Sequence, residues 1–170
     1  MKLTIHQFMT GIFAGIVCAT AIAGDKLYTE TRSLNPGMAM KAAMVAEKKG
    51  AADGYQVAVA VVDRSGVLQA FIRKPLAGAH TVDVSITKAR TSASFKTATI
   101  EMMKNERLQQ LNYAEGVLLI GGGIPIRVGG HFYGGIGVSG APGEKMAGDV
   151  DHACAQAGIA AIAEELEFAE

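Results

Sequence analysis

The sequence predicts an α+β domain, in which helices pack against an antiparallel sheet. Residues 55–63 are rich in valine and apolar on both faces, as expected for a strand in the middle of a sheet. The turn residues Asp63-Arg64-Ser65-Gly66 and the following segment 67–73 make this strand the first half of a hairpin. Three more apolar segments, separated by glycines, follow at residues 116–120, 124–128 and 131–138. Hairpin connections pair strands antiparallel, so we expect a hairpin and a three-stranded meander in one sheet.

Segments with helical periodicity surround these strands, at residues 36–50, 82–95, 100–111 and 144–167. Asn35 and Pro36 suit the N-cap and first position of the first helix, and Thr81 suits the N-cap of the second. The stripe that we expect to be buried in the second helix consists of Val82, Ile86, Ala89 and Ala93. Lys88 and Arg90 lie off this stripe.

Residues 1–23 have the features of a secretory signal peptide. Lys2 precedes an uncharged apolar run, and Ala21-Ile22-Ala23 is a small-x-small cleavage signal. The run is interrupted by Gly11 and Gly15 and is shorter than the about 20 apolar residues of a membrane-spanning helix. An uncleaved anchor and lipidation at Cys18 are the alternatives. We expect cleavage, a single domain over residues 24–170, no stable membrane insertion afterwards, and a periplasmic or extracellular location.

Charge and cysteine content narrow the class of protein further. The chain has 16 basic and 16 acidic side chains, and this balance argues against nucleic acid as a partner, whose phosphates attract basic surfaces. Of the two cysteines, Cys18 lies in the signal, so no disulfide can form within the mature chain. Cys154 lies in an alanine-rich helical segment, where we expect a buried small hydrophobe rather than a reactive thiol.

The glycine-rich segments resemble nucleotide-binding motifs without their context. Gly135-x-Gly137-x-x-Gly140 matches the dinucleotide pattern, but that pattern opens a βαβ unit and only the terminal helix follows. Residues 121–123 form no P-loop, because no Lys-Ser/Thr follows them. We expect these glycines to permit tight turns and the close approach of another backbone or of a flat ligand.

Motifs for hydrolysis or metal binding are weak. The sequence has no G-x-S-x-G elbow, and its histidines lack the spacing of a zinc site. Asp149, Asp151 and His152 fall at the start of the last helix, where a solvated first turn is expected and a metal or proton-transfer role is the alternative. The E-x-x-E spacing near the C-terminus indicates a polar face, with a surface iron site as the alternative.

His80 has the most informative surroundings. It follows a loop containing proline and glycine and directly precedes Thr81 at the predicted helix start. Helix N-termini attract anionic groups such as carboxylates. An imidazole at this place, with Lys88 and Arg90 nearby, suits a metal tetrapyrrole and its propionates; a structural or exposed histidine is the other interpretation.

Four motifs occur in a fixed order along the chain. They are VVDRSG at 61–66, HTVD at 80–83 leading into KARTSA at 88–93, GGGIPI at 121–126, and GGIGVSGAPG at 134–143. In this order they resemble the GlcG/HbpS haem-binding family, whose domain also forms the C-terminal half of PduO-type proteins. The resemblance covers residues 34–163 and implies a profilin-like fold with a five-stranded antiparallel sheet, assembled as a homo-oligomer from dimer to octamer.

The resemblance also implies a cofactor and a site. Haem, or another tetrapyrrole, is the implied ligand, and the segment 76–81 resembles that of the secreted haem-binding branch. His80 and Thr81 are then the haem-proximal pair, in which either His80 is the ligand of the haem iron or Thr81 places its hydroxyl oxygen near it. Lys88 and Arg90 are the implied propionate partners.

The leading hypothesis is therefore an exported haem-binding protein that serves haem storage, sensing or degradation. One alternative is an enzyme that acts on haem or another small molecule in the same cleft. The other is an oligomeric accessory module without a ligand. Whether the protein is an enzyme stays open, because no residue pair in the sequence compels acid–base catalysis.

Overall fold

The computed structural model describes residues 27–169, so the predicted signal peptide lies outside the described residues. The chain divides into the units Met1–Glu30 and Thr31–Glu170, and the second carries the fold. Its elements are α1 (Pro36–Ala52), β1 (Ala58–Asp63), β2 (Leu68–Arg73), α2 (Thr81–Phe95), α3 (Thr99–Lys104), the 3₁₀ helix η1 (Glu106–Tyr113), β3 (Gly123–Val128), β4 (His131–Ser139) and α4 (Asp149–Glu167). In the part of the chain described, no helix has the length and apolar character needed to cross a membrane.

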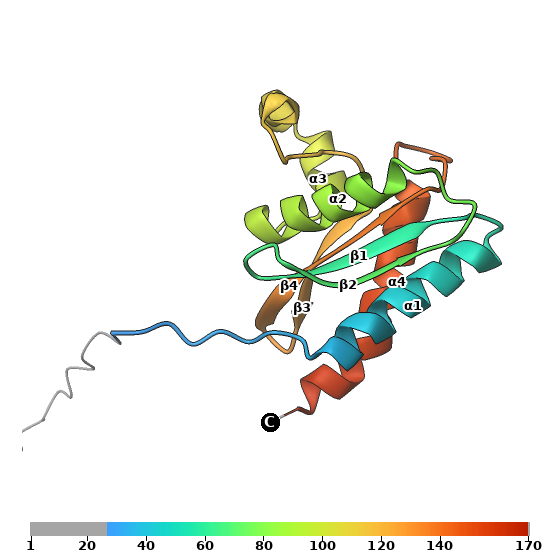
Figure 1. Ribbon diagram of the computed structural model, residues 1–170. Coiled ribbons are helices and arrows are strands. Elements are labelled where there is room, and N and C mark those ends of the chain that lie inside the picture. The colour runs from blue at the N-terminus through green and yellow to red at the C-terminus, as the bar shows by residue number, and fades with distance from the viewer. Residues whose placement is uncertain (1–26, 170) are drawn as a thin grey trace, which may run out of the picture. The chain divides into compact units, whose positions relative to one another are not determined.

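An antiparallel sheet with the strand order β2-β1-β4-β3 forms the centre of the unit. Helices α1 and α4 cover one face of the sheet and α2 covers the other (Figure 1). Along β1 and the residue before it, Val57, Val59 and Val61 belong to the core shared with α1 and α4. Ala60 and Val62 point the other way and pack beneath α2. The prediction of a central strand buried on both faces is confirmed.

The sheet has four strands among the described residues, so the expectation of five is wrong. Residues 116–120 do not pair as a strand, because side chains of neighbouring helices bind their backbone groups. The Leu118 N–H donates to Thr91 Oγ1 at 3.0 Å. The Thr99 hydroxyl donates to the Ile120 carbonyl at 2.7 Å. A neighbouring strand would need these same backbone groups.

Helix α4 begins at Asp149 rather than at residue 144. The Asp149 carboxylate accepts hydrogen bonds from the backbone N–H groups of Glu144 (3.0 Å) and Lys145 (2.8 Å). It therefore folds the preceding residues back into a loop. Gly148 ends this loop at φ 77°, a left-handed conformation that favours glycine.

Two other helix predictions also need correction. Thr81 lies inside α2 rather than capping it, and His80 occupies the N-cap position without a side-chain cap hydrogen bond. The single helix expected over residues 100–111 is divided into α3 and η1 at Asn105, whose backbone is extended.

The glycines of β4 bring α2 unusually close to the sheet. A Cβ atom added to Gly135 would lie 2.5 Å from the Ala89 carbonyl oxygen, and one added to Gly137 would lie 2.5 Å from the Ala89 nitrogen. The helix therefore packs directly on bare strand backbone. This is the close backbone approach that the sequence predicts, and it gives the G-x-G-x-x-G match a structural explanation in an antiparallel sheet.

Candidate functional site

An open pocket of about 560 Å³, which we call the α2 pocket, lies beside the N-terminal half of α2. Its volume falls within the range of about 300–1,000 Å³ that is typical of ligand pockets. It is lined by His80, Val84, Lys88, Ile120, Ser139, Gly140, Ala141, Pro142, Gly143, Ala147, Gly148 and Asp151.

One wall of the pocket is a single stripe of α2. His80, Val84 and Lys88 are spaced four residues apart, so they follow one another along one face of the helix. The facing wall comes from the loop that follows β4 and from the start of α4, and it includes three residues without side chains, Gly140, Gly143 and Gly148. Backbone is therefore exposed to the pocket opposite the side chains of α2.

His80 stands at the rim with its imidazole exposed. A Cβ atom added to Gly78 would lie 2.6 Å from His80 Cε1 and 2.9 Å from Nδ1, so the bare Gly78 makes room for the ring. Because the ring caps no helix N–H, its nitrogens stay available to a ligand. Thr81, by contrast, is 1% exposed, and its hydroxyl donates to the Gly78 carbonyl at 2.6 Å. Thr81 thus braces the loop that carries His80.

Lys88 is buried, although the sequence pattern places it off the buried stripe. Its Nζ lies 2.8 Å from Asp151 Oδ2 and 3.0 Å from the Val138 carbonyl oxygen, and its side chain is 2% exposed. An ammonium has three donors, and these two contacts engage two of them. Asp151 Oδ1 in turn accepts the Ala141 N–H at 3.0 Å, which holds the loop after β4.

Burial and charge act in opposite directions on this pair. Removal from water lowers the pKa of Lys88 and raises the pKa of Asp151. The attraction between the two charges opposes both shifts. We infer that the pair is ionised, because the 2.8 Å contact and the carbonyl and N–H partners satisfy both groups.

Asp151 is a charged pocket residue that the sequence did not assign to the site. The expected solvated first turn of the last helix is wrong for this residue, which is 3% exposed. The local spacing does contain a signal, since Asp151, Cys154, Ala155, Gly158 and Ile162 recur at helical intervals and are all buried.

Arg90 lies away from the α2 pocket. Its Nε donates to the Gly66 carbonyl at 3.0 Å, in the turn between β1 and β2. Of the four residues singled out in the sequence, the fold brings His80 and Lys88 together at the pocket, places Thr81 behind His80, and directs Arg90 elsewhere.

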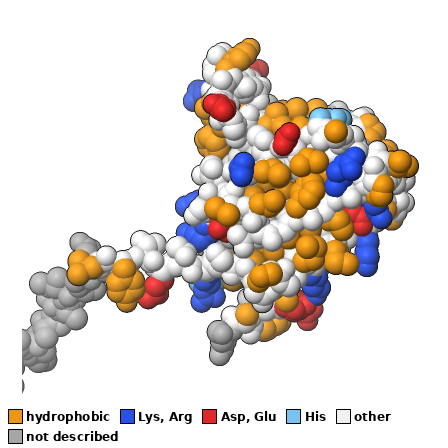
Figure 2. Space-filling view, viewed as in Figure 1, with side chains coloured by type: hydrophobic (Ala, Val, Ile, Leu, Met, Phe, Trp, Pro, Cys, Tyr) orange, Lys and Arg blue, Asp and Glu red, His pale blue; other side chains and the backbone are white. Residues whose placement is uncertain are grey.

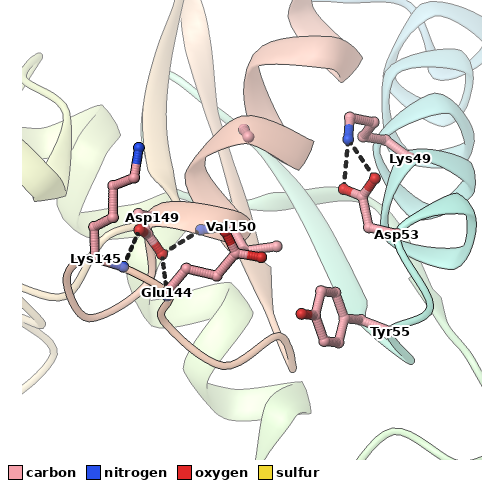
Figure 3. Close-up of a pocket in the computed structure, with 8 residues that line it drawn as sticks. Lys49, Asp53, Tyr55, Glu144, Lys145, Asp149 and Val150 are labelled. Atoms are coloured by element: carbon pink, nitrogen blue, oxygen red, sulfur yellow. Dashed lines mark hydrogen bonds and ion pairs between the residues drawn. The ribbon is translucent and has the colours of Figure 1, made fainter.

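A second pocket, of about 610 Å³, lies between the end of α1 and the loop before α4 (Figure 3). Its polar groups are largely engaged within the chain. Lys49 pairs with Asp53, and Asp149 binds the loop backbone. No group of three or more His, Cys, Asp or Glu side chains that could hold a metal ion occurs within residues 27–169.

Cys154 is fully buried, which confirms the prediction of a buried small hydrophobe at this position. Burial raises the pKa of its thiol to about 11.

These features define a small α+β domain with a ligand-sized pocket between one helix and a glycine-rich loop. Residues 34–160 match the family model described as haem degrading protein HbpS-like. The chain therefore belongs to the HbpS-like family. No curated protein has a significant match to the chain.

Solved structures agree with this assignment. A double mutant of HbpS from Streptomyces reticuli is 35% identical, with a TM-score of 0.70 over 91% of this chain and 97% of that chain. The Klebsiella pneumoniae protein ORFY is 26% identical, with a TM-score of 0.71 over 79% and 94%. A PduOC–haem complex is 27% identical, with a TM-score of 0.68 over 76% and 95%. The family and the haem complex support a haem-associated function.

Proposed function

We propose that this protein is exported and binds haem in the α2 pocket, with His80 as the ligand of the iron. The observation that carries the proposal is the exposed His80 imidazole at the rim of a pocket of ligand size. The HbpS-like family and the haem complex of PduOC support the choice of ligand. Export rests on the signal peptide predicted for residues 1–23.

The residues of the pocket fit a tetrapyrrole. Val84, Ile120 and Pro142 offer apolar contacts, and the glycines opposite them permit close approach of a flat ring. The remaining N–H of Lys88 can donate to a propionate, whereas Arg90 would have to release Gly66 to do so. Thr81 acts in this proposal by holding the loop under His80. Bound haem would supply an iron centre for redox chemistry or haem turnover.

Titration of the protein with hemin tests the proposal. We expect a shifted Soret band, and we expect His80→Ala to weaken hemin binding by at least about tenfold. His131→Ala is the matched control, because His131 is also exposed but does not line the α2 pocket. Equal hemin affinity for the wild type and for a His80→Ala, Thr81→Ala double variant would refute the site.

The family description gives a reason to test haem degradation as a second function. Bound haem would then lose its absorbance under ascorbate or peroxide, with release of iron, faster than haem in a control protein. Loss of haem absorbance at the same rate as in the control protein would leave storage or sensing as the role of the site.

We also propose that the protein self-associates. On the face that carries α2, apolar side chains gather over the β1–β2 ribbon (Figure 2). Phe71 of β2 and Ile86 of α2, which pack against the core between α2 and the sheet, are only partly buried. Light scattering of the purified protein, with and without hemin, gives the number of copies, and a monomer under both conditions would contradict this part of the proposal.

A further inference from the structure

A cluster of cations surrounds one aromatic ring at the far end of α2. The guanidinium carbons of Arg64 and Arg127 lie 5.0 Å and 5.4 Å from the centroid of the Phe132 ring, and Lys96 Nζ lies 5.6 Å from it. The three residues come from the β1–β2 turn, the C-cap of α2 and β3. Lys and Arg side chains gather at this end of α2 in the space-filling view (Figure 2).

The ion pairs of the described residues do not involve this cluster. Within residues 27–169, Arg64, Lys96 and Arg127 form no ion pair. Asp63, the neighbour of Arg64, instead accepts the backbone N–H groups of the turn at 2.8 Å and 2.9 Å. The C-terminal end of α2 contributes only about half a negative charge, which balances a small part of three cations. The cluster therefore keeps an excess of positive charge that an anionic ligand can neutralise.

The cations are held in place yet keep donors free. Arg64 donates one hydrogen bond to the Phe132 carbonyl at 2.7 Å, and Arg127 donates one to the Lys96 carbonyl at 3.4 Å. A guanidinium has five N–H donors in a planar fork that matches carboxylate and phosphate oxygens. The Phe132 ring attracts all three cations by cation–π contact. A preorganised set of cations costs little ordering when a ligand binds.

We propose that Arg64, Lys96 and Arg127 form a binding site for a multivalent oxyanion, either a phosphate compound or an oligocarboxylate. Several unpaired cations around one ring favour a ligand with more than one negative charge over a single carboxylate. The site is separate from the α2 pocket, because His80 precedes the first residue of α2 and Lys96 follows the last. The 15 residues of α2 between them span about 22 Å.

Calorimetric titration at constant ionic strength tests the site, with pyrophosphate, citrate and acetate as probes. We expect at least one multivalent probe to bind at least tenfold more tightly than acetate. Pyrophosphate alone points to a phosphate compound, and citrate alone to an oligocarboxylate. The Arg64→Gln, Arg127→Gln double variant should lose at least tenfold in affinity. Arg107→Gln, which removes an exposed cation on η1, should change the affinity less than twofold.

A second measurement needs no variant. In amide spectra of the wild-type protein, the bound probe should shift the signals of residues 64–66 and 127–132 and leave those of residues 139–143 in place. The proposal is overturned if acetate binds as tightly as the multivalent probes, if the double variant retains full affinity, or if Arg107→Gln loses as much as the double variant. Urea unfolding confirms that both variants are folded, and Lys96→Gln replaces the double variant if it is not.

Discussion

The Lys88 ammonium and the Asp151 carboxylate form an ion pair 2.8 Å long that joins α2 to α4, although 63 positions separate them in the sequence. The two side chains are 2% and 4% exposed. They connect helices from opposite faces of the sheet. Lys88 also donates to the Val138 carbonyl, and Asp151 also accepts the Ala141 N–H. This ion pair in the lining of the α2 pocket therefore also connects the two helical layers.

Removing one partner of this pair should be far more costly than removing both. Lys88→Met leaves the Asp151 charge buried without its counterion, and we expect a loss of about 3–5 kcal/mol in the free energy of unfolding. The double variant Lys88→Met, Asp151→Asn keeps an acceptor for the Ala141 N–H and removes the charge, so it should recover part of that loss. Urea denaturation of the three proteins measures both effects.

The control for this prediction is an ion pair at the surface. Lys41 pairs with Glu165, and their side chains are 42% and 51% exposed. Lys41→Met should cost about 0–1 kcal/mol, because solvent screens such pairs. Equal losses for Lys41→Met and Lys88→Met, or a double variant less stable than Lys88→Met, would show that the buried pair has no special role.

A methyl group at Gly137 should force α2 away from the sheet. The added Cβ would overlap the Ser85 carbonyl oxygen and lie 2.5 Å from the Ala89 nitrogen, and neither backbone atom can turn aside. We expect Gly137→Ala to lower the free energy of unfolding by about 3 kcal/mol, the upper end of the usual cost of overpacking. Gly37→Ala, within helix α1, should change it by less than about 1 kcal/mol. A Gly137→Ala protein as stable as the control would contradict the backbone contact.

The sequence predicts correctly those helices, strands and turns that depend on the pattern of nearby residues. The valine-rich residues 55–63 predict a strand buried on both faces. The Gly129-Gly130 pair between the predicted strands 124–128 and 131–138 favours a tight turn, and both glycines have positive φ values of 55° and 77°. The helices at 36–50 and 82–95 also appear close to their expected ends. In each case, residues close together in the sequence determine the local structure.

The errors arise where the cause lies far along the chain. The apolar segment 116–120 predicts a strand, but the hydroxyls of Thr91 in α2 and Thr99 in α3 bind its backbone groups. Lys88 falls outside the predicted buried stripe of its own helix and is nevertheless buried, because its counterion comes from α4. The same limit applies to the pocket, because the helical spacing of Asp151 predicts its burial but not its charge partner Lys88, which lies 63 positions away in the sequence.

Protonation of the Asp149 carboxylate should lower the free energy of unfolding in acid. Hydrogen bonds from the backbone N–H groups of Glu144 and Lys145 are the main cause that lowers the pKa of Asp149 from 3.8 to about 2. Because the unfolded chain takes up this proton first, the stabilisation is complete above about pH 4 and is lost as the pH falls towards 2. Asp149→Asn should therefore be less stable than the wild type at pH 6, and the gap should close near pH 2.

Urea unfolding at pH 6, 4 and 2.5 measures this gap. Asp83→Asn is the control, since Asp83 is an exposed residue in the first turn of α2 that anchors no loop. The gap between this control and the wild type should vary less with pH. A gap for Asp149→Asn that stays constant from pH 6 to 2.5 would show that the loop at 144–148 does not depend on the charge.

The orientation of His80 should depend on the bare Gly78 beside it. A methyl group at Gly78 would meet the imidazole Cε1 at 2.6 Å, and this ring is the free end of a side chain that can rotate. We expect Gly78→Ala to change the free energy of unfolding by less than about 1 kcal/mol, while the Hε1 signal of His80 moves and that of His131 does not. If His80 binds the haem iron, hemin affinity should fall together with this movement. An unmoved His80 signal would show that Gly78 does not set the ring's position, whereas a moved ring with unchanged hemin affinity would place the iron ligand elsewhere.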